Sequence, residues 1–182
     1  AFEYSRLVEE GQGAELFHPH HLLHLPGQKL VYDASAALGY RGRSYGVVRA
    51  VSMLSGSLAL CLFYLIAGHI SNGRKGLPGI ATAGLLFSYG FIRYACEVEI
   101  YLPAMALALA AVYSAVRAEK SGGWFVAGIL FAVLAVLMHT INAAAALVVI
   151  PVIYWLDSNR WKRGMMHVVA SVGLIGLVYL VV

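Results

Sequence analysis

The chain has 182 residues, of which 60% are hydrophobic and only 12% carry a charge, and its mean hydropathy is +0.76. Soluble domains carry about 25% charged residues, so this composition excludes an ordinary soluble globule and indicates an integral membrane protein. The formal net charge is +4, but the basic residues lie between apolar runs rather than in one patch. This pattern orients helices in a bilayer. It predicts the lipid bilayer as a partner and excludes nucleic acid.

Residues 1–44 are polar and predict an interfacial segment that contains two short amphipathic helices. Tyr4, Leu7 and Val8 share one face of the first helix. The second helix has an apolar stripe at helical spacing, which consists of Leu30, Val31, Ala34 and Leu38. Helices this short and one-sided are expected to lie along a membrane surface rather than to cross it.

Six apolar segments follow, at about residues 45–70, 77–96, 99–116, 124–138, 143–155 and 164–182. The fourth and fifth are short for a membrane span, which needs about 20 residues. A single helix made of both would reach about 50 Å, which is too long. We therefore expect an all-α membrane protein, with the interfacial segment at 1–44 and a bundle of about six transmembrane helices at 45–182.

The basic residues support this count because they follow the first, third and fifth segments. They are Arg74, Lys75, Arg117, Lys120, Arg160, Lys162 and Arg163. Six helices put all of them on one side of the membrane, as the positive-inside rule requires, whereas five helices do not. Residues 1–44 and the corners at 96–101 and 139–142 are then expected on the opposite, extracytoplasmic side.

Four histidines stand within seven residues, at His18, His20, His21 and His24. Pro19 limits how two flanking rings converge, and we expect it, with Pro26, to keep this stretch out of regular helix. The spacing matches no familiar zinc pattern, although a divalent metal stays possible. Hydrogen bonding to a phosphate or a sugar hydroxyl and simple packing of the loop against the helices are the two other interpretations.

A second polar group lies at the corner between the second and third apolar segments. Glu97 and Glu99 stand there with Arg93 and Tyr101 close by. Ionisable groups at membrane depth are costly and usually face a cavity, a partner or the interface. One interpretation places a carboxylate at a substrate pocket, as base, metal ligand or acceptor of a sugar hydroxyl. The other makes Arg93 and Glu97 an ordinary i,i+4 ion pair and leaves Glu99 solvated.

His139, Thr140 and Asn142 interrupt the apolar sequence at the next corner on the same side. Asn142 is suited to cap the helix that follows it. His139, next to this cap, could also reach the same cavity as the other polar residues.

The layout resembles the GT-C membrane glycosyltransferases, in particular the protein O-mannosyltransferase-like and aminoarabinose-transferase-like proteins of bacteria. The resemblance rests on residues 2–6 (FEYSR), 17–23 (FHPHHLL) and 97–103 (EVEIYLP), and on His139 in a short helix pair. It covers nearly the whole chain. In that class an essential aspartate ends the first membrane helix. It is expected before Ala1, so that the chain by itself would be an inactive, N-terminally truncated piece.

The resemblance implies transfer of a sugar from a polyprenyl-phosphate donor to a protein, lipid or glycan acceptor. The transfer would take place on the extracytoplasmic face of a bacterial cytoplasmic membrane. The implied catalytic carboxylates are Glu3, Glu97 and Glu99, and the implied substrate-binding residues are His18, His20, His21, Arg93, Tyr101 and His139. The rival interpretation is a transporter or lipid-binding membrane protein without covalent chemistry. Inverted repeats would favour the rival, and the sequence has no convincing internal repeat.

Overall fold

A computed structural model of the protein describes residues 2–97, 99–118, 121–156 and 160–181. The regular elements of this described part are all helices, so the prediction of an all-α fold is confirmed. Glu119, Lys120 and Asp157 lie outside the described residues. The elements are α1 (Phe2–Glu10), η1 (Gly13–Leu16), α2 (His24–Ala37), α3 (Ser44–Ile70), α4 (Leu77–Leu86), α5 (Tyr89–Cys96), α6 (Tyr101–Arg117), α7 (Gly122–Met138), η2 (Thr140–Asn142), η3 (Ala145–Val149), α8 (Ile150–Leu156) and α9 (Trp161–Val181).

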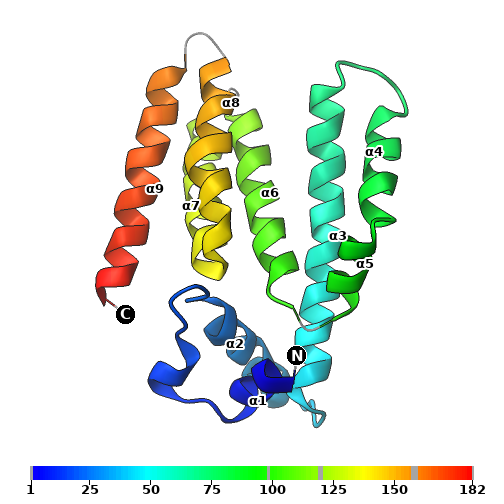
Figure 1. The fold of residues 1–182 in the computed structure, drawn as a ribbon, viewed down its shortest axis with the longest axis vertical. Coiled ribbons are helices and arrows are strands. Elements are labelled where there is room, and N and C mark those ends of the chain that lie inside the picture. The colour runs from blue at the N-terminus through cyan, green and yellow to red at the C-terminus, as the bar shows by residue number, and fades with distance from the viewer. Residues whose placement is uncertain (1, 98, 119–120, 157–159, 182) are drawn as a thin grey trace.

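The helices after α2 form a bundle in which successive segments alternate in direction (Figure 1). α1 and α2 lie across the end of the bundle at which α3 and α6 begin and α7 ends. The predicted corners at 96–101 and 139–142 are at this same end, whereas the loop at 71–76 is at the other. The arrangement therefore gathers the interfacial segment and both polar corners on one side.

Within the described part of the chain, two helices are long and apolar enough to cross a membrane, namely α3 and α9. A third span results if α5 and α6, bent by 114° relative to each other, are counted together. The other apolar helices, α4, α7 and the run Thr140–Leu156, have 10–17 residues. The structure therefore supports a membrane protein, but helix length and composition do not confirm the predicted count of about six spans.

Small residues let the central helices pack closely. The buried cluster between α6 and α7 includes Ala111, Ala115 and Ala132, and Tyr154 of α8 completes it. A Cβ atom on Gly128 would lie 3.5 Å from the Cβ of Ser114, which is ordinary contact distance. Without a hydrophobic driving force inside a bilayer, helices associate through such close packing of small side chains. The short helix α7 is thereby fixed beside α6.

The interfacial segment is joined to the bundle at the start of α3. The Ser5 and Ser44 hydroxyls lie 2.6 Å apart, and both residues are buried. The Ser44 backbone N–H donates to the Glu9 carboxylate at 2.8 Å. A carboxylate at a helix N-terminus satisfies a free N–H and faces the positive end of the helix dipole. Val8 of α1 and Val48 of α3 belong to one buried cluster below these polar contacts.

Three predicted boundaries differ from the structure. The segment at 77–96 is divided into α4 and α5, because the Ser88 hydroxyl accepts the Phe91 N–H at 3.4 Å and starts a new helix. Pro26 lies inside the first turn of α2 rather than in a loop, and this turn tolerates proline since its N–H groups have no helical partner. The segment predicted at 143–155 begins earlier, with the 3-10 turn η2 and the π-helix η3, before α8.

The contact between α3 and α6 gives a testable prediction for stability. A Cβ atom on Gly56 would lie 2.7 Å from Cδ1 of Leu102 and 3.5 Å from the Cβ of Ala95. Leu102 is itself buried, so it has little room to move. We expect Gly56→Leu to lower the free energy of unfolding by roughly 1–3 kcal/mol through overpacking, seen as a lower Tm in detergent. Gly84→Leu on α4 is the control, because no described atom would lie within 4 Å of its Cβ. Equal Tm shifts in both variants would contradict this packing.

Candidate functional site

The histidine loop is held by backbone contacts to the ends of two bundle helices. The Leu23 N–H donates to the Leu137 carbonyl at 3.0 Å, and the Thr140 N–H donates to the His20 carbonyl at 3.2 Å. The Tyr179 hydroxyl of α9 donates to the Pro19 carbonyl at 2.7 Å. Leu22 is buried against α7, in a cluster with Ile129, Val133 and Leu137. These contacts fix the loop at the end of the bundle where α7 stops.

The loop places three imidazole rings beside the corner that follows α7. The His18 and His21 rings are stacked, with centroids 5.3 Å apart. His20 lies 5.6 Å from His18 by the same measure. The His21 ring meets the His139 ring edge to face at 4.5 Å. Residues 118 positions apart in the chain (139 − 21) therefore share one polar cluster, which we call the histidine rim: His18, His20, His21 and His139.

Hydrogen bonds determine where two of these rings carry their protons. Nδ1 of His139 accepts the backbone N–H of Ile141 at 3.2 Å. Nδ1 of His18 accepts the backbone N–H of His20 at 3.3 Å. A neutral imidazole that accepts at one nitrogen carries its hydrogen on the other. Neutral His18 and His139 therefore have a donor at Nε2 that is not used by these local contacts.

Tyrosines extend the rim toward the start of α6. The Tyr101 ring lies 5.3 Å from His139, and Tyr94 lies 5.0 Å from Tyr101. Together with Ser88 and Asn142, these side chains line part of a cavity of about 360 Å³. The sequence suggested that Asn142 caps the helix that follows it, but this prediction is wrong. Its side-chain amide instead donates to the carbonyls of Ala135 and His139, both at 3.1 Å, and so caps the C-terminal end of α7.

The Glu99 carboxylate lies within electrostatic reach of α1. The pKa of Tyr4 is raised first by burial, then by the negative charge of Glu99, and further by Tyr101 and Glu3. The Glu99 backbone is held on α3, where the Ser52 hydroxyl donates to its carbonyl at 3.4 Å. The structure thus brings Glu3 and Glu99, far apart in sequence, to the same tyrosine.

Glu97 points to a different partner. Its carboxylate lies 3.5 Å from Arg93 in an i,i+4 ion pair at the end of α5, and both side chains are about half exposed. The Arg93 guanidinium also donates to the Tyr89 hydroxyl at 3.4 Å. Of the two interpretations of this corner, the ordinary ion pair is therefore present for Glu97, whereas the charge of Glu99 acts on Tyr4 of the interfacial helix α1.

His24 is the buried member of the histidine group. Its side chain is 0% exposed, and neither ring nitrogen has a hydrogen-bond partner among the described residues. Its ring meets the Tyr4 ring edge to face at 5.6 Å. Burial, followed by the neighbouring His21 and His139, lowers the pKa of His24 to about 4. The ring is therefore neutral at physiological pH.

Burial also lowers the pKa of the two rim histidines in closest contact. The pKa of His21 falls to about 4, first through burial and then through His139, His18 and His20. The pKa of His139 is lowered by burial and by His20. Both act near neutral pH as uncharged hydrogen-bond donors rather than as cations.

The sequence named His24 only as one of the four loop histidines, and it did not single out Tyr4 as a site residue or predict that the two residues meet. The available signals were the position of Tyr4 on the apolar face of its helix and the spacing of His24, three residues after His21. As to a metal, no group of three or more His, Cys, Asp or Glu side chains within the described ranges could hold a metal ion. The site as described consists of hydrogen-bond donors, three tyrosines and carboxylates.

A family model described as dolichyl-phosphate-mannose-protein mannosyltransferase matches residues 24–182. The match includes His24, His139, the corner at 97–101 and every helix from α2 onward, whereas His18, His20 and His21 precede it. No curated protein and no solved structure matches the chain.

The buried His24 gives a prediction for stability against pH. Its pKa is about 4 in the folded protein, against the ordinary value of 6.5, so between these values the unfolded chain binds more protons. The contribution of His24 to the free energy of unfolding is therefore fully present above pH 6.5. It is lost as the pH drops toward 4, by up to about 3 kcal/mol. We expect Tm in detergent to fall over this range, and His24→Leu to make the fall shallower. His69→Leu, at an exposed position of α3, is the control; an identical slope in His24→Leu and the parent protein would contradict the assignment.

Proposed function

The chain belongs to the dolichyl-phosphate-mannose-protein mannosyltransferase family and is a membrane glycosyltransferase of this kind, and we propose that it transfers a sugar from a polyprenyl-phosphate donor. The acceptor is on the extracytoplasmic side, at the histidine rim. The observation that carries the proposal is the meeting of His21, His139 and Tyr101, with ring distances of 4.5 Å and 5.3 Å. Three distant segments thus supply one polar site at the end of an apolar bundle.

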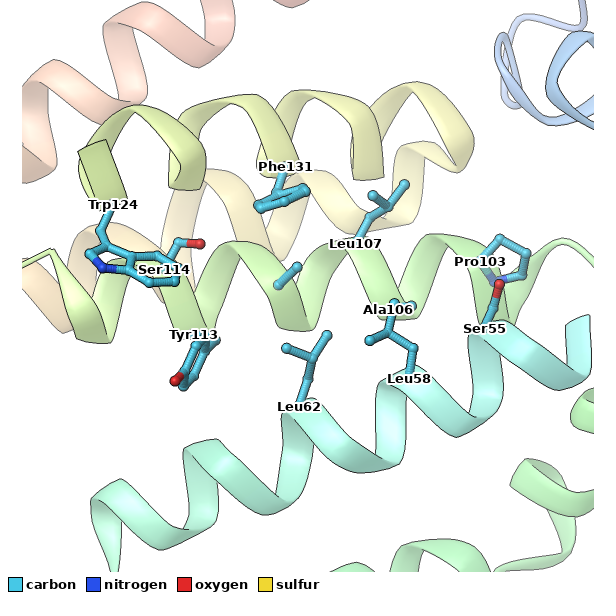
Figure 2. Close-up of a pocket in the computed structure, with 11 residues that line it drawn as sticks. Ser55, Leu58, Leu62, Pro103, Ala106, Leu107, Tyr113, Ser114, Trp124 and Phe131 are labelled. Atoms are coloured by element: carbon cyan, nitrogen blue, oxygen red, sulfur yellow. The ribbon is translucent and has the colours of Figure 1, made fainter. Parts of the chain in front are cut away.

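An apolar groove beside this site suits the lipid part of the donor. The groove has a volume of about 490 Å³ and lies between α3, α6 and α7. Figure 2 shows Ser55 and Pro103 at one end, Tyr113 and Trp124 at the other, and leucines between them. Pro103 belongs to the first turn of α6, two residues after Tyr101. A polyprenyl chain in this groove would pack against apolar side chains within the membrane and would leave its phosphate next to the polar corner.

The proposed reaction needs a base for the acceptor hydroxyl. The hydroxyl oxygen attacks the anomeric carbon of the sugar, the bond from that carbon to the phosphate oxygen breaks, and the hydroxyl proton passes to a carboxylate. Glu99 is the first candidate among the described carboxylates, because its charge acts on Tyr4 and its backbone lies two residues from Tyr101. Glu97 is occupied by Arg93. Glu3 lies on α1 and is the third candidate, with an aspartate before Ala1 as the alternative implied by the resemblance.

The departing lipid phosphate needs hydrogen-bond donors. Nε2 of His18 and of His139 are such donors, since their Nδ1 atoms accept backbone N–H groups. His20 and His21 belong to the same cluster, and Arg93 supplies a positive charge at the neighbouring corner. Donors aimed at the atom on which charge develops stabilise a transition state more than a ground state. Neutral imidazoles can do this without repelling one another.

The experiment that tests this function is transfer from polyprenyl-phosphate mannose in membranes containing the protein. We expect Glu99→Gln to reduce kcat by about 100-fold or more, because a general base contributes this much, with unchanged insertion into the membrane. We expect His20→Ala to abolish transfer as well, because its ring belongs to the histidine rim. The His20 variant is informative since the backbone carbonyl that binds Thr140 is kept.

Glu15→Gln is the matched control, because Glu15 is an exposed carboxylate on the same interfacial segment. Parent-level turnover in the Glu99 variant would remove this carboxylate from the mechanism. No transfer by the parent protein from any polyprenyl-phosphate sugar, with binding of the lipid retained, would favour the lipid-binding alternative.

The groove gives a separate prediction for the donor lipid. Ala110 lines the groove and Ala108, on the same helix, does not. Ala110→Leu adds a side chain where the lipid would lie, so part of the lipid chain loses its contacts with the groove. We expect KM for a long-chain donor to rise several-fold, which corresponds to about 1 kcal/mol or more of lost binding free energy. KM for a donor with a short lipid should change little, and Ala108→Leu should leave both values unchanged. Equal effects on long and short donors would exclude this groove as the lipid site.

A further inference from the structure

A second apolar groove lies at the opposite end of the bundle from the histidine rim, between α8 and α9. Its volume is about 270 Å³, and it is lined by Pro151, Val152, Trp155, Trp161, Gly164 and Met165, among others. The end of α8 and the start of α9 are at the top of Figure 1, whereas α1 and α2 are at the bottom. This groove therefore belongs to a site other than the proposed transferase site.

Gly164 explains how the groove forms. A Cβ atom at this position would lie 3.3 Å from the Pro151 carbonyl oxygen and 3.5 Å from the Cβ of Tyr154. The two helices thus meet closely at Gly164, while the large side chains on either side stand away from the contact. The exposed fractions are 73% for Trp155 and 56% for Trp161. Tryptophans exposed at the ends of apolar helices are typical of the membrane–water interface.

A positive charge lies at the mouth of the groove. The Lys162 ammonium is 5.9 Å from the centre of the Trp161 ring, which is within cation–π distance. Arg163 is directed away, because its guanidinium donates to the Ala118 carbonyl at 3.1 Å. Among the charged side chains that the structure describes at this end, all are basic: Arg74, Lys75, Arg117, Arg160, Lys162 and Arg163. The sequence adds Lys120, Glu119 and Asp157 outside the described residues, so that seven basic residues stand against two acidic ones.

We propose that this groove binds an anionic phospholipid of the leaflet opposite the histidine rim, with an acyl chain between Trp155 and Trp161 and the headgroup phosphate at Lys162. An apolar slot with a cation at its mouth is complementary to a molecule with an apolar chain and an anionic head. Basic sites between membrane helices bind lipid headgroups in this way. From Trp161 to Val168 along α9 the groove extends about 10 Å into the membrane, which accommodates part of an acyl chain. The proposal does not depend on sugar transfer.

The test uses tryptophan fluorescence with lipids brominated in the acyl chain. The protein is reconstituted in phosphatidylcholine vesicles that contain brominated phosphatidylglycerol or brominated phosphatidylcholine. The two brominated lipids are compared over the same series of mole fractions. The difference from a variant with both Trp155→Phe and Trp161→Phe isolates the emission of the groove. We expect half-maximal quenching by the anionic lipid at an about fivefold lower mole fraction than by the zwitterionic one, corresponding to roughly 1 kcal/mol for one lysine.

Lys162→Gln should abolish this preference, and Lys75→Gln should retain it. The control removes the same charge at the same end of the bundle, in the loop before α4. Equal quenching by both lipids in the parent protein would overturn the proposal, as would a preference that survives Lys162→Gln. A preference lost equally in both variants would also overturn it, because this would be general attraction to a basic surface and not binding in the groove.

Discussion

The site depends on the backbone bonds that join the histidine loop to the ends of α7 and α9. Leu23, His20 and Pro19 each use a main-chain atom for this purpose. In an apolar surrounding a free backbone N–H or carbonyl is costly, so these bonds satisfy the polar main chain at the place where α7 has to stop. They also bring the His21 ring against His139. The position of the side chains at the rim thus follows from the need to end a helix at a membrane surface.

The bundle below provides the rigid support for this rim. Alanines and glycines in α6 and α7 allow close packing of helices that are too short to be stable spans by themselves. The close contact of Gly56 with Leu102 holds the start of α6 on α3. The corner that carries Glu99 and Tyr101 is therefore placed by small residues whose only visible property in the sequence is the lack of a side chain.

The sequence predicted much of the fold because hydropathy and charge act over whole segments. It predicted all helices, apolar segments at nearly the observed positions, and basic loops at the end opposite the histidines. Figure 1 shows the loop at 71–76, the end of α8 and the start of α9 at that end. The interruption at Ser88 depends on one hydroxyl, and the π-helix at Ala145–Val149 on packing against neighbours, so neither produces a pattern at the level of a segment.

The same distinction holds for the candidate site. The histidine run and the corner at 97–101 stand out because polar residues are rare in this chain, and the structure brings them together. Tyr4 and His24 did not stand out as a pair, because their contact depends on how α1 and α2 are rotated against each other. The ion pair of Glu97 likewise follows from the end of α5, where Glu97 lies one helical turn after Arg93.

The three bonds that hold the histidine loop also have a kinetic meaning. A segment tied at both sides to packed helices does not open as a mobile lid, since opening would break these hydrogen bonds and expose the buried Leu22. Molecules would therefore enter and leave the rim past a fixed framework. The dissociation rate would then differ from one compound to the next according to how tightly each is bound. It would not be one common rate set by the movement of a loop.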